Sequence, residues 1–323
     1  MLAASVTELD PTGAMAGLTV GSVPDPEPAD GWVRVKVNAA SLNHHDLWSL
    51  KGVGLPAERL PMILGCDAAG VTDDGREVIV HAVIGDPDAG GGDETLDPRR
   101  SLLSEVHPGT LAEYVCVPAR NLVDKPAAMS FVEASCLPTA WLTAYRMLTT
   151  RGDLRAGETV LVQGVGGGVS TAAIALAKAM GARVWATSRD AGKRQAAVAF
   201  GADEAFESGA RLPDRVDLVI ESVGDATWSH SLKSLRPGGR IVVCGATTGP
   251  NPPADLARVF FLQLSVVGST MGTLRELESL ADFMANTGIA PTIAHTLPLD
   301  DAREGLSLLD GGTEVGKIVL AVA

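Results

Sequence analysis

One stretch of the chain, with four glycines between an apolar run and an alanine-rich run, constrains the fold most strongly. The apolar run Thr159–Gln163 predicts a buried strand, and Ser170–Met180 has the residue spacing of a helix. Glycine between a strand and a helix permits the tight turn that opens a βαβ unit. The turn reads Q-G-V-G-G-G-V-S, with its glycines at Gly164, Gly166, Gly167 and Gly168.

The segments that follow continue this alternation. Strands are predicted at Arg183–Thr187, Val216–Ile220, Ile241–Val243 and Leu264–Val267, and helices at Ala191–Phe200, Ala226–Leu235 and Leu274–Ala285. Strands separated by helices of about 10–15 residues indicate a doubly wound parallel sheet. The predicted fold class is therefore α/β.

The first third of the chain is instead rich in short strands. Val33–Val37 and Glu77–Ala82 predict strands between turn-forming residues. Asp86–Arg100 is rich in Asp, Gly and Pro without apolar periodicity, and it predicts an exposed loop. Gly316–Ala323 predicts a terminal strand that returns to this β-rich part.

The charge balance and the cysteines exclude several classes of protein. The chain has 26 Lys+Arg against 39 Asp+Glu, a net charge of −13, and no basic run. This composition argues against binding to nucleic acid or to a membrane surface. The cysteines, at Cys66, Cys116, Cys136 and Cys244, are scattered, which fits a reducing cytoplasm and excludes a four-cysteine zinc module. We expect an acidic, cytoplasmic α/β enzyme.

The glycine turn has the composition of a dinucleotide-binding loop. Glycine lets a pyrophosphate approach backbone N–H groups, and the helix N-terminus adds partial positive charge. Two registers fit. One starts from Gly164 and Gly166 and places Val169 at the third position, whereas the other places Gly167 and Ser170 there.

The end of the second strand indicates which cofactor binds. An NAD site has an acidic residue there to bind the ribose hydroxyl, whereas this chain has Ser188 and Arg189, with Lys193 one helical turn later. Ser188 can donate to a 2′-phosphate, which Arg189 and Lys193 can neutralise, so we expect NADP(H). In the alternative, both basic side chains only face solvent and Asp190 caps the next helix.

Several segments, in order along nearly the whole chain, resemble the medium-chain dehydrogenase/reductase superfamily, and within it the quinone-oxidoreductase-like, zinc-independent branch. The matching segments are Ser41–Trp48, Leu64–Gly70, Gly109–Tyr114, Pro138–Tyr145, the glycine turn, Gly245–Thr248, Gly268–Thr270 and Gly316–Leu320.

The resemblance implies a GroES-like catalytic domain over residues 1–126, a Rossmann domain over 127–290, and a return to the catalytic domain over 291–323. It also implies a homodimer formed through the Rossmann edge strand near Leu262–Val267. Residues at the family positions that contact the nicotinamide half of the cofactor are Thr143, Gly245, Ala246, Ser269 and Thr270.

The positions that bind catalytic zinc in other members differ in this chain. Asn43 and Thr139 stand where those members have cysteines, and Cys66–Asp67 stands in place of their His–Glu pair. The resemblance therefore implies no metal. A zinc site made of Cys66, Asp67 and either His44 or His45 stays an alternative, because these are legitimate zinc ligands.

The same resemblance supplies the catalytic candidates Asn43, His45 and Asp46. Asn43 would orient substrate or cofactor, His45 would donate a proton, and Asp46 would anchor the local loop or a neighbouring imidazole. The expected activity is NADPH-dependent reduction of an enone, quinone or aldehyde, with conjugated acceptors favoured because no Lewis acid is present. The rival hypotheses are a zinc alcohol dehydrogenase with altered ligands and a non-catalytic NADPH-binding or sensor protein.

Overall fold

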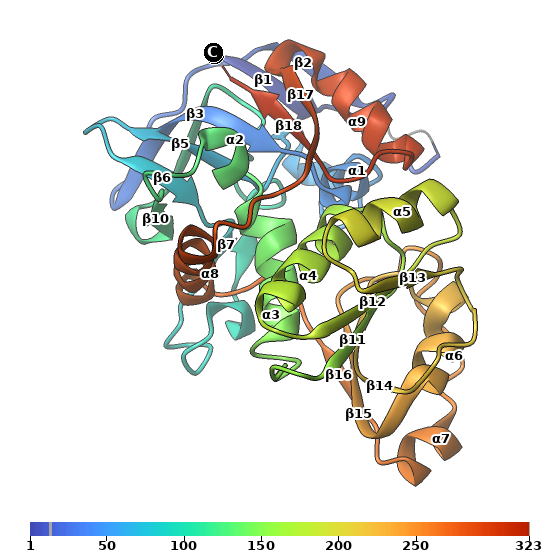
Figure 1. The fold of residues 1–323 in the computed structure, drawn as a ribbon. Helices are drawn as coiled ribbons and strands as arrows, with labels where there is room; N and C mark the ends of the chain where they lie inside the picture. Colours follow the sequence, from blue (N-terminus) through green and yellow to red (C-terminus); the bar gives the residue numbers. More distant parts are fainter. Residues whose placement is uncertain (13–14, 323) are drawn as a thin grey trace. The chain divides into compact units, whose positions relative to one another are not determined.

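The computed structural model describes residues 1–12 and 15–322 and divides into two compact units (Figure 1). Unit 1 comprises Met1–Leu142 with Met271–Ala323, and unit 2 comprises Thr143–Thr270. Unit 2 is thus inserted into unit 1 along the chain, between residues 142 and 271. Helix α8 (Leu274–Thr287) belongs to unit 1 because it packs against β10 (Leu122–Asp124) and the helical turn Leu137–Trp141.

The strands of unit 1 form sheets that are largely antiparallel. The main sheet has the order β10-β6-β5-β3-β18-β17, with β9 also paired to β3, and a smaller sheet has the order β2-β1-β4. The strands are β1 (Leu2–Val6), β2 (Leu18–Ser22), β3 (Trp32–Ser41), β4 (Met62–Ile63), β5 (Ala68–Thr72), β6 (Glu77–Val80), β7 (Val83–Ile84), β8 (Ser101–Leu102), β9 (Tyr114–Pro118), β17 (Ile293–Pro298) and β18 (Lys317–Ala321).

The predicted return of the C-terminal strand to the β-rich unit is confirmed. Strand β18 pairs antiparallel with β3, with Val319 opposite Ser41, and parallel with β17. The apolar side chains of these strands share one buried core with helices α1 (His44–Leu50) and α9 (Ala302–Gly311). A short helix, α2 (Phe131–Ala134), completes this unit. This pairing brings the C-terminal segment beside the turn between β3 and α1.

Unit 2 has the predicted parallel sheet. Its order is β13-β12-β11-β14-β15-β16, and every neighbouring pair is parallel. The strands are β11 (Thr159–Val162), β12 (Arg183–Thr187), β13 (Glu204–Phe206), β14 (Val216–Glu221), β15 (Leu235–Val243) and β16 (Ser265–Gly268). Strand β15 begins six residues before the predicted Ile241, because Leu235 already pairs with Val216 across a register shift.

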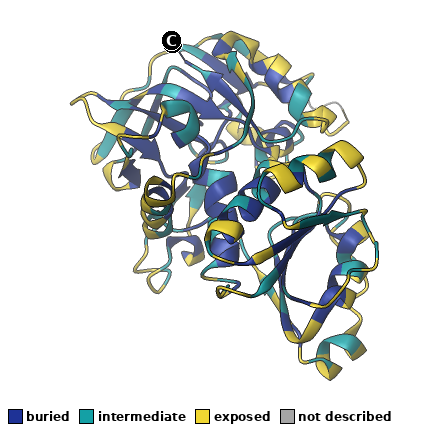
Figure 2. Ribbon diagram, viewed as in Figure 1, coloured by how far each residue is buried: buried dark blue, intermediate teal, exposed yellow. Residues whose placement is uncertain are grey.

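Helices lie on both sides of this sheet (Figure 1), and its inner strands β11, β12 and β14 are mostly buried while the outer helix faces are exposed (Figure 2). The helices of the unit, including the one that spans the boundary, are α3 (Leu142–Leu148), α4 (Gly168–Ala179), α5 (Ala191–Ala199), α6 (Asp225–Ser234) and α7 (Leu256–Phe261). Within the described residues, no helix is long and apolar enough to cross a bilayer.

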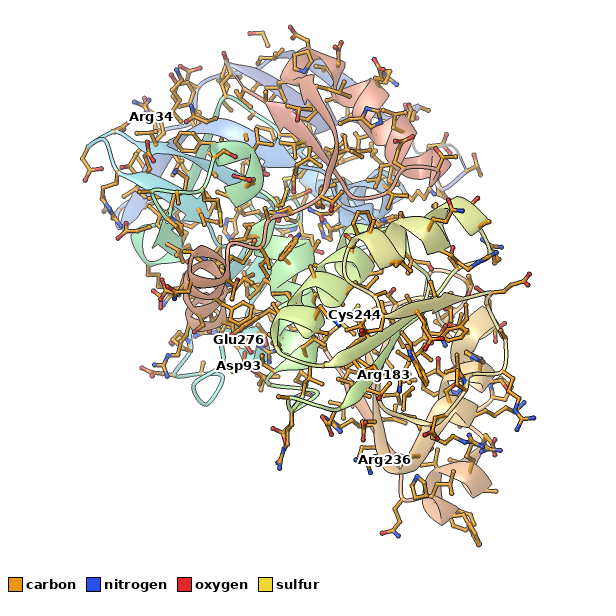
Figure 3. All side chains as sticks on the ribbon, in the orientation of Figure 1. Arg34, Asp93, Arg183, Arg236, Cys244 and Glu276 are labelled. Carbon is orange, nitrogen blue, oxygen red and sulfur yellow. The ribbon has the colours of Figure 1, made fainter. Side chains whose placement is uncertain are left out.

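The prediction that Asp86–Arg100 is simply an exposed loop is wrong for its centre. Glu94, Thr95 and Asp97 are buried, and the Glu94 carboxylate accepts a hydrogen bond from the backbone N–H of Leu274 at the start of α8. Figure 3 shows Asp93 of this loop near Glu276 of α8. A carboxylate is stabilised at a helix N-terminus by the unpaired N–H groups there. The acidic composition therefore serves a buried contact as well as solvation.

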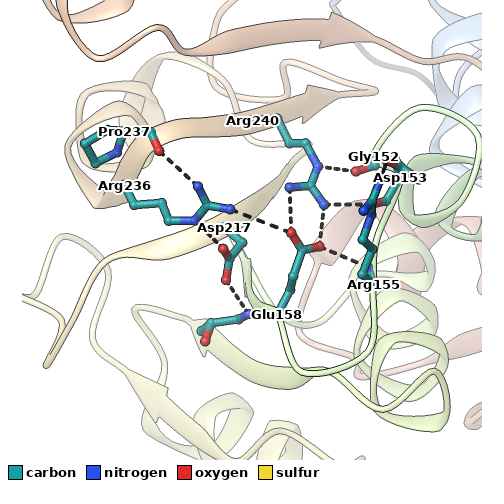
Figure 4. A network of polar contacts seen from close by, with 9 residues as sticks. Gly152, Asp153, Arg155, Glu158, Asp217, Arg236, Pro237 and Arg240 are labelled. Atoms are coloured by element: carbon teal, nitrogen blue, oxygen red, sulfur yellow. Dashed lines mark hydrogen bonds and ion pairs between the residues drawn. The ribbon is translucent and has the colours of Figure 1, made fainter.

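A polar network joins the start of the unit 2 sheet to the turn before it (Figure 4). Arg240 forms an ion pair with Glu158 and donates to the carbonyls of Gly152 and Asp153. Arg236 instead forms an ion pair with Asp217 and contacts Glu158 more distantly, at 3.9 Å. The side chain of Arg240 is 16% exposed and that of Arg236 is 45% exposed. Arg240 is thus the more strongly desolvated partner.

We expect Arg240→Met to lower the free energy of unfolding of unit 2 by about 2 kcal/mol, because two carbonyls lose their donor and Glu158 keeps only the Arg155 N–H and the distant Arg236. Arg236→Met, the matched control, is expected to cost less than about 1 kcal/mol because its charge is solvent-screened. Urea unfolding followed by circular dichroism measures both. Equal losses for the two variants would contradict this assignment.

Candidate functional site

The predicted phosphate loop forms a tight turn at the carboxyl end of β11. Gly164 and Gly166 have φ values of 71° and 145°, which disfavour any residue with a side chain. Gly167 precedes the first residue of α4, Gly168, so the first N–H groups of this 12-residue helix open at the turn. The loop and helix therefore form the anion-binding arrangement expected for a dinucleotide.

Neighbouring loops crowd this end of the sheet. A Cβ at Gly164 would lie 2.4 Å from Cγ2 of Val223, which follows β14. A Cβ at Gly224 would lie 2.9 Å from Cα of Ala246, which follows β15. The turns after β11, β14 and β15 thus converge at the carboxyl ends of the strands, where open α/β sheets bind their ligands.

Lys193 lies over the glycine turn, where a phosphate would gain from a cation. Its Nζ would be 2.9 Å from a Cβ built on Gly166, so glycine leaves room for this side chain as well as for the turn. Asp190 accepts from the Lys193 N–H at 2.8 Å and caps α5. The capping role weighed for Asp190 in the sequence is confirmed, and Lys193 does more than face solvent.

The end of β12 presents Ser188 and Arg189 beside this lysine. Ser188 is buried and its hydroxyl accepts from the Asp190 N–H at 3.2 Å, while Arg189 is exposed. The sequence analysis missed Arg194, whose guanidinium donates to the carbonyls of Ser188 and Arg189 at 2.8 and 3.1 Å. Its position directly after Lys193 in α5 was the available signal. Arg194 fixes the turn that carries both candidate phosphate contacts.

The candidates for the nicotinamide half occupy strand ends in unit 2. Gly245 and Ala246 follow β15, and Ser269 and Thr270 follow β16, with the Ser269 N–H donating to the Val243 carbonyl at 2.8 Å. The Ser269 hydroxyl is buried and has no partner within the described residues. Thr143, the remaining candidate, is buried in α3, and Val169 is half-buried in α4.

Unit 1 holds a buried polar cluster around Asp67, which directly precedes β5. The Asp67 Oδ2 accepts from the Ser41 hydroxyl at 2.6 Å and from the Asn43 Nδ2 at 2.8 Å. The Lys317 Nζ lies 3.5 Å from the same oxygen and donates to Asn43 Oδ1 at 2.6 Å and to the Leu42 carbonyl at 2.7 Å. Asp67 is 0% exposed and Lys317 is 3% exposed. The cluster therefore contains a desolvated ion pair.

The side chain of Asn43 bonds to several groups of the protein. Besides Asp67, its Nδ2 donates to the Ser41 carbonyl at 3.3 Å, and its Oδ1 accepts from Lys317. The amide thus positions the side chains of Asp67 and Lys317, and a contact to substrate or cofactor stays a prediction. Asp46 has the predicted anchoring geometry, since its Oδ2 accepts from the Asn43 N–H at 2.8 Å. Burial raises the pKa of Asp46 to about 6.

His45 lies between a thiol and a carboxylate. Its Nδ1 is 3.4 Å from Cys66 Sγ and its Nε2 is 2.9 Å from Glu105 Oε1, while the Cys66 thiol donates to the Leu103 carbonyl at 3.3 Å. Burial alone would lower the pKa of His45, but its hydrogen bonds to Cys66 and Glu105 outweigh burial and raise this pKa. Burial raises the pKa of Cys66. Glu105 was missed because nothing in the sequence links it to His45.

The donor set in unit 1 does not fit a zinc ion. Asn43 and Asp67 already bind the Lys317 ammonium. The Cys66 thiol donates its proton to the Leu103 carbonyl, and the hydroxyl of Thr139 is a poor zinc ligand. Within residues 1–12 and 15–322, no three His, Cys, Asp or Glu side chains are arranged to hold a metal. His44 is exposed at the start of α1. We therefore derive no chemistry through zinc.

Two known protein families match this chain. Residues 29–127 match the alcohol dehydrogenase GroES-like domain, and residues 168–286 match the zinc-binding dehydrogenase family. The acryloyl-coenzyme A reductase of Metallosphaera sedula is 33% identical over 95% of this chain and 97% of its own length.

Two solved structures are also similar. An NAD-dependent alcohol dehydrogenase has 36% identity and a TM-score of 0.92, with 100% of both chains covered. A 2-octenoyl-CoA carboxylase reductase in complex with NADP and 2-octenoyl-CoA has 26% identity and a TM-score of 0.90, covering 99% of this chain and 87% of that chain. With its GroES-like unit and its Rossmann-like unit, the chain belongs to the medium-chain dehydrogenase/reductase superfamily of nicotinamide-dependent oxidoreductases.

Proposed function

We propose that this protein is an NADPH-dependent reductase of conjugated carbonyl compounds that works without zinc. The buried cluster of Asn43, Asp67 and Lys317 supports the proposal, because the oxygen atoms of Asn43 and Asp67 that could bind a metal already contact the Lys317 ammonium. A simple ketone needs a Lewis acid to polarise its oxygen. A conjugated acceptor spreads the developing charge over several atoms, so hydrogen-bond donors suffice.

Bound NADPH would supply a hydride to the β-carbon of such an acceptor. The protein must then provide a proton at the α-carbon or at the oxygen. His45 is the candidate donor, because the Glu105 carboxylate favours its charged form and its Nδ1 makes only the longer contact, 3.4 Å to Cys66 Sγ. Trp48, whose side chain is 39% exposed next to this helix turn, offers an apolar wall for substrate.

The relatives narrow the substrate class. The acryloyl-coenzyme A reductase and the 2-octenoyl-CoA carboxylase reductase are named for α,β-unsaturated thioesters, which are conjugated carbonyl compounds. We therefore place α,β-unsaturated thioesters first among the acceptors, ahead of enones, quinones and aldehydes. The similarity to an NAD-dependent alcohol dehydrogenase favours alcohol oxidation as the second candidate.

The preference for NADP(H) is supported by the basic groups around the glycine turn. The Lys193 ammonium lies over Gly166, and Arg189 is exposed at the end of β12. The acidic residue nearest to this strand end, Asp190, is committed to capping α5. A 2′-phosphate would therefore meet two cations at this edge of the sheet, where the nearest carboxylate caps α5.

A homodimer through β16 is supported by exposed apolar side chains. Strand β16 is the last strand in the order of its sheet, and an edge strand can pair with a second copy. Val266 on this strand is 48% exposed, and Phe260 and Phe261 on α7 are 70% and 81% exposed. Apolar surface of this kind marks a protein contact more often than bare solvent.

We expect purified protein to oxidise NADPH with but-2-enoyl thioesters or but-3-en-2-one at least about 100-fold faster than with butanal, because only the conjugated acceptors delocalise charge without a Lewis acid. Absorbance at 340 nm measures the rates. Faster NAD-dependent alcohol oxidation would favour the second candidate. Tight NADPH binding without turnover of any acceptor would indicate a non-catalytic binding protein.

Arg189→Ala is expected to raise the KM for NADPH about tenfold, the loss of one charge-assisted hydrogen bond to the 2′-phosphate, while the KM for NADH changes less than about twofold. Arg211→Ala, at another exposed position of unit 2, is the control and is expected to change neither value. Steady-state kinetics with both cofactors measures the effect. An equal rise for NADH and NADPH would refute the preference.

Sedimentation velocity at micromolar concentration is expected to show a dimer for the wild type and a monomer for Val266→Asp, because the charge would be buried in the new contact. Val198→Asp is a matched control, since Val198 is 50% exposed on α5 in the same unit and should leave the dimer intact. A monomeric wild type would contradict the proposed assembly.

A further inference from the structure

Lys317 is a buried cation at the centre of a set of oxygen acceptors. The ammonium of Lys317 donates to Leu42 O at 2.7 Å and to Asn43 Oδ1 at 2.6 Å, and it forms an ion pair with Asp67 Oδ2 at 3.5 Å. These acceptors comprise one backbone carbonyl, one amide oxygen and one carboxylate. The ammonium thus occupies a cage of oxygens of the type that binds metal cations.

The carboxylate in this cage depends on that ammonium. Asp67 is 0% exposed, and its Oδ1 has no hydrogen-bond partner in the described part of the chain. The hydroxyl of Ser41 and the amide of Asn43 help to solvate Oδ2 but carry no charge. A buried carboxylate without a cation is strongly unfavourable, so Lys317 is the group that allows Asp67 to be buried.

The resemblance in the sequence aligns Asn43 and the Cys66–Asp67 pair with the positions that hold catalytic zinc in other members of the superfamily. In this structure the oxygens of Asn43 and Asp67 face an ammonium instead. A divalent ion on either oxygen would lie within a few ångströms of that charge in a poorly solvated region, where repulsion is strong. The ammonium cannot move into solvent without leaving Asp67 unpaired.

We propose that Lys317 is a built-in cation that takes the place of a metal in this cluster and keeps divalent ions out of it. The inference rests on the metal-free reaction proposed above. Lys317 comes from β18, so the C-terminal strand supplies the charge that holds the turn between β3 and α1 against the start of β5. Lys317 is a positioning residue, since it acts through Asn43 and Asp67.

Removal of the ammonium should turn this cluster into a metal site. We expect Lys317→Met, purified with chelator and then freed of it, to bind Zn²⁺ at least tenfold more tightly than the wild type in isothermal titration calorimetry. Zinc should also raise the Tm of this variant. In the double variant Lys317→Met/Asp67→Asn the gain in zinc affinity should disappear, because the buried carboxylate that would bind the zinc is gone.

Lys125→Met is the matched control. The Lys125 ammonium is also buried, with a side chain 4% exposed, and it binds two carbonyls and a carboxylate, but its partner Glu77 is 51% exposed. Water can solvate that carboxylate, so we expect no gain of zinc affinity there.

Equal zinc affinity in the wild type and in Lys317→Met would overturn the proposal. So would a wild type that binds one zinc per chain at micromolar or tighter affinity. If Lys317→Met does not fold, Lys317→Gln keeps a donor for Leu42 O, and the wild-type titration still decides. None of these measurements uses turnover, so a failed reductase assay and a failed metal prediction are distinguishable.

Discussion

The ion pair between Lys317 and Asp67 is the interaction on which the organisation of unit 1 depends. A carboxylate that is 0% exposed requires a cation, and the cation comes from the C-terminal strand β18. Satisfying this one charge fixes the turn after β3 through Leu42 and Asn43, and fixes the start of β5 through Asp67. Because β18 also pairs with β3, packing and electrostatics impose the same arrangement.

Unit 2 contains groups suited to binding a negatively charged cofactor. Its glycine turn and the N-terminus of α4 offer backbone N–H groups for phosphate, and Lys193 adds a cation over Gly166. The protein as a whole carries a net charge of −13, so these basic groups form a local exception. A negatively charged cofactor would thus be attracted by a few oriented groups instead of by the overall charge.

The sequence predicted those features that local patterns determine. The alternation of strands and helices in unit 2, the glycine turn and the Asp190 cap all depend on residues close together in the chain. Features that depend on distant partners escaped prediction. Asn43 was expected to contact a ligand, but Lys317, far along the chain, occupies its amide oxygen. Glu105 beside His45 and Glu94 at the start of α8 are further examples, because neither partner is marked by spacing or composition.

The proposed hydride transfer needs no metal. The most direct test is NADPH oxidation with an α,β-unsaturated thioester after exhaustive treatment with a strong zinc chelator, using NADPH deuterated at the transferred position. We expect an unchanged kcat and a primary isotope effect that is the same before and after chelation. Loss of activity on chelation, with recovery on adding one equivalent of zinc, would contradict it.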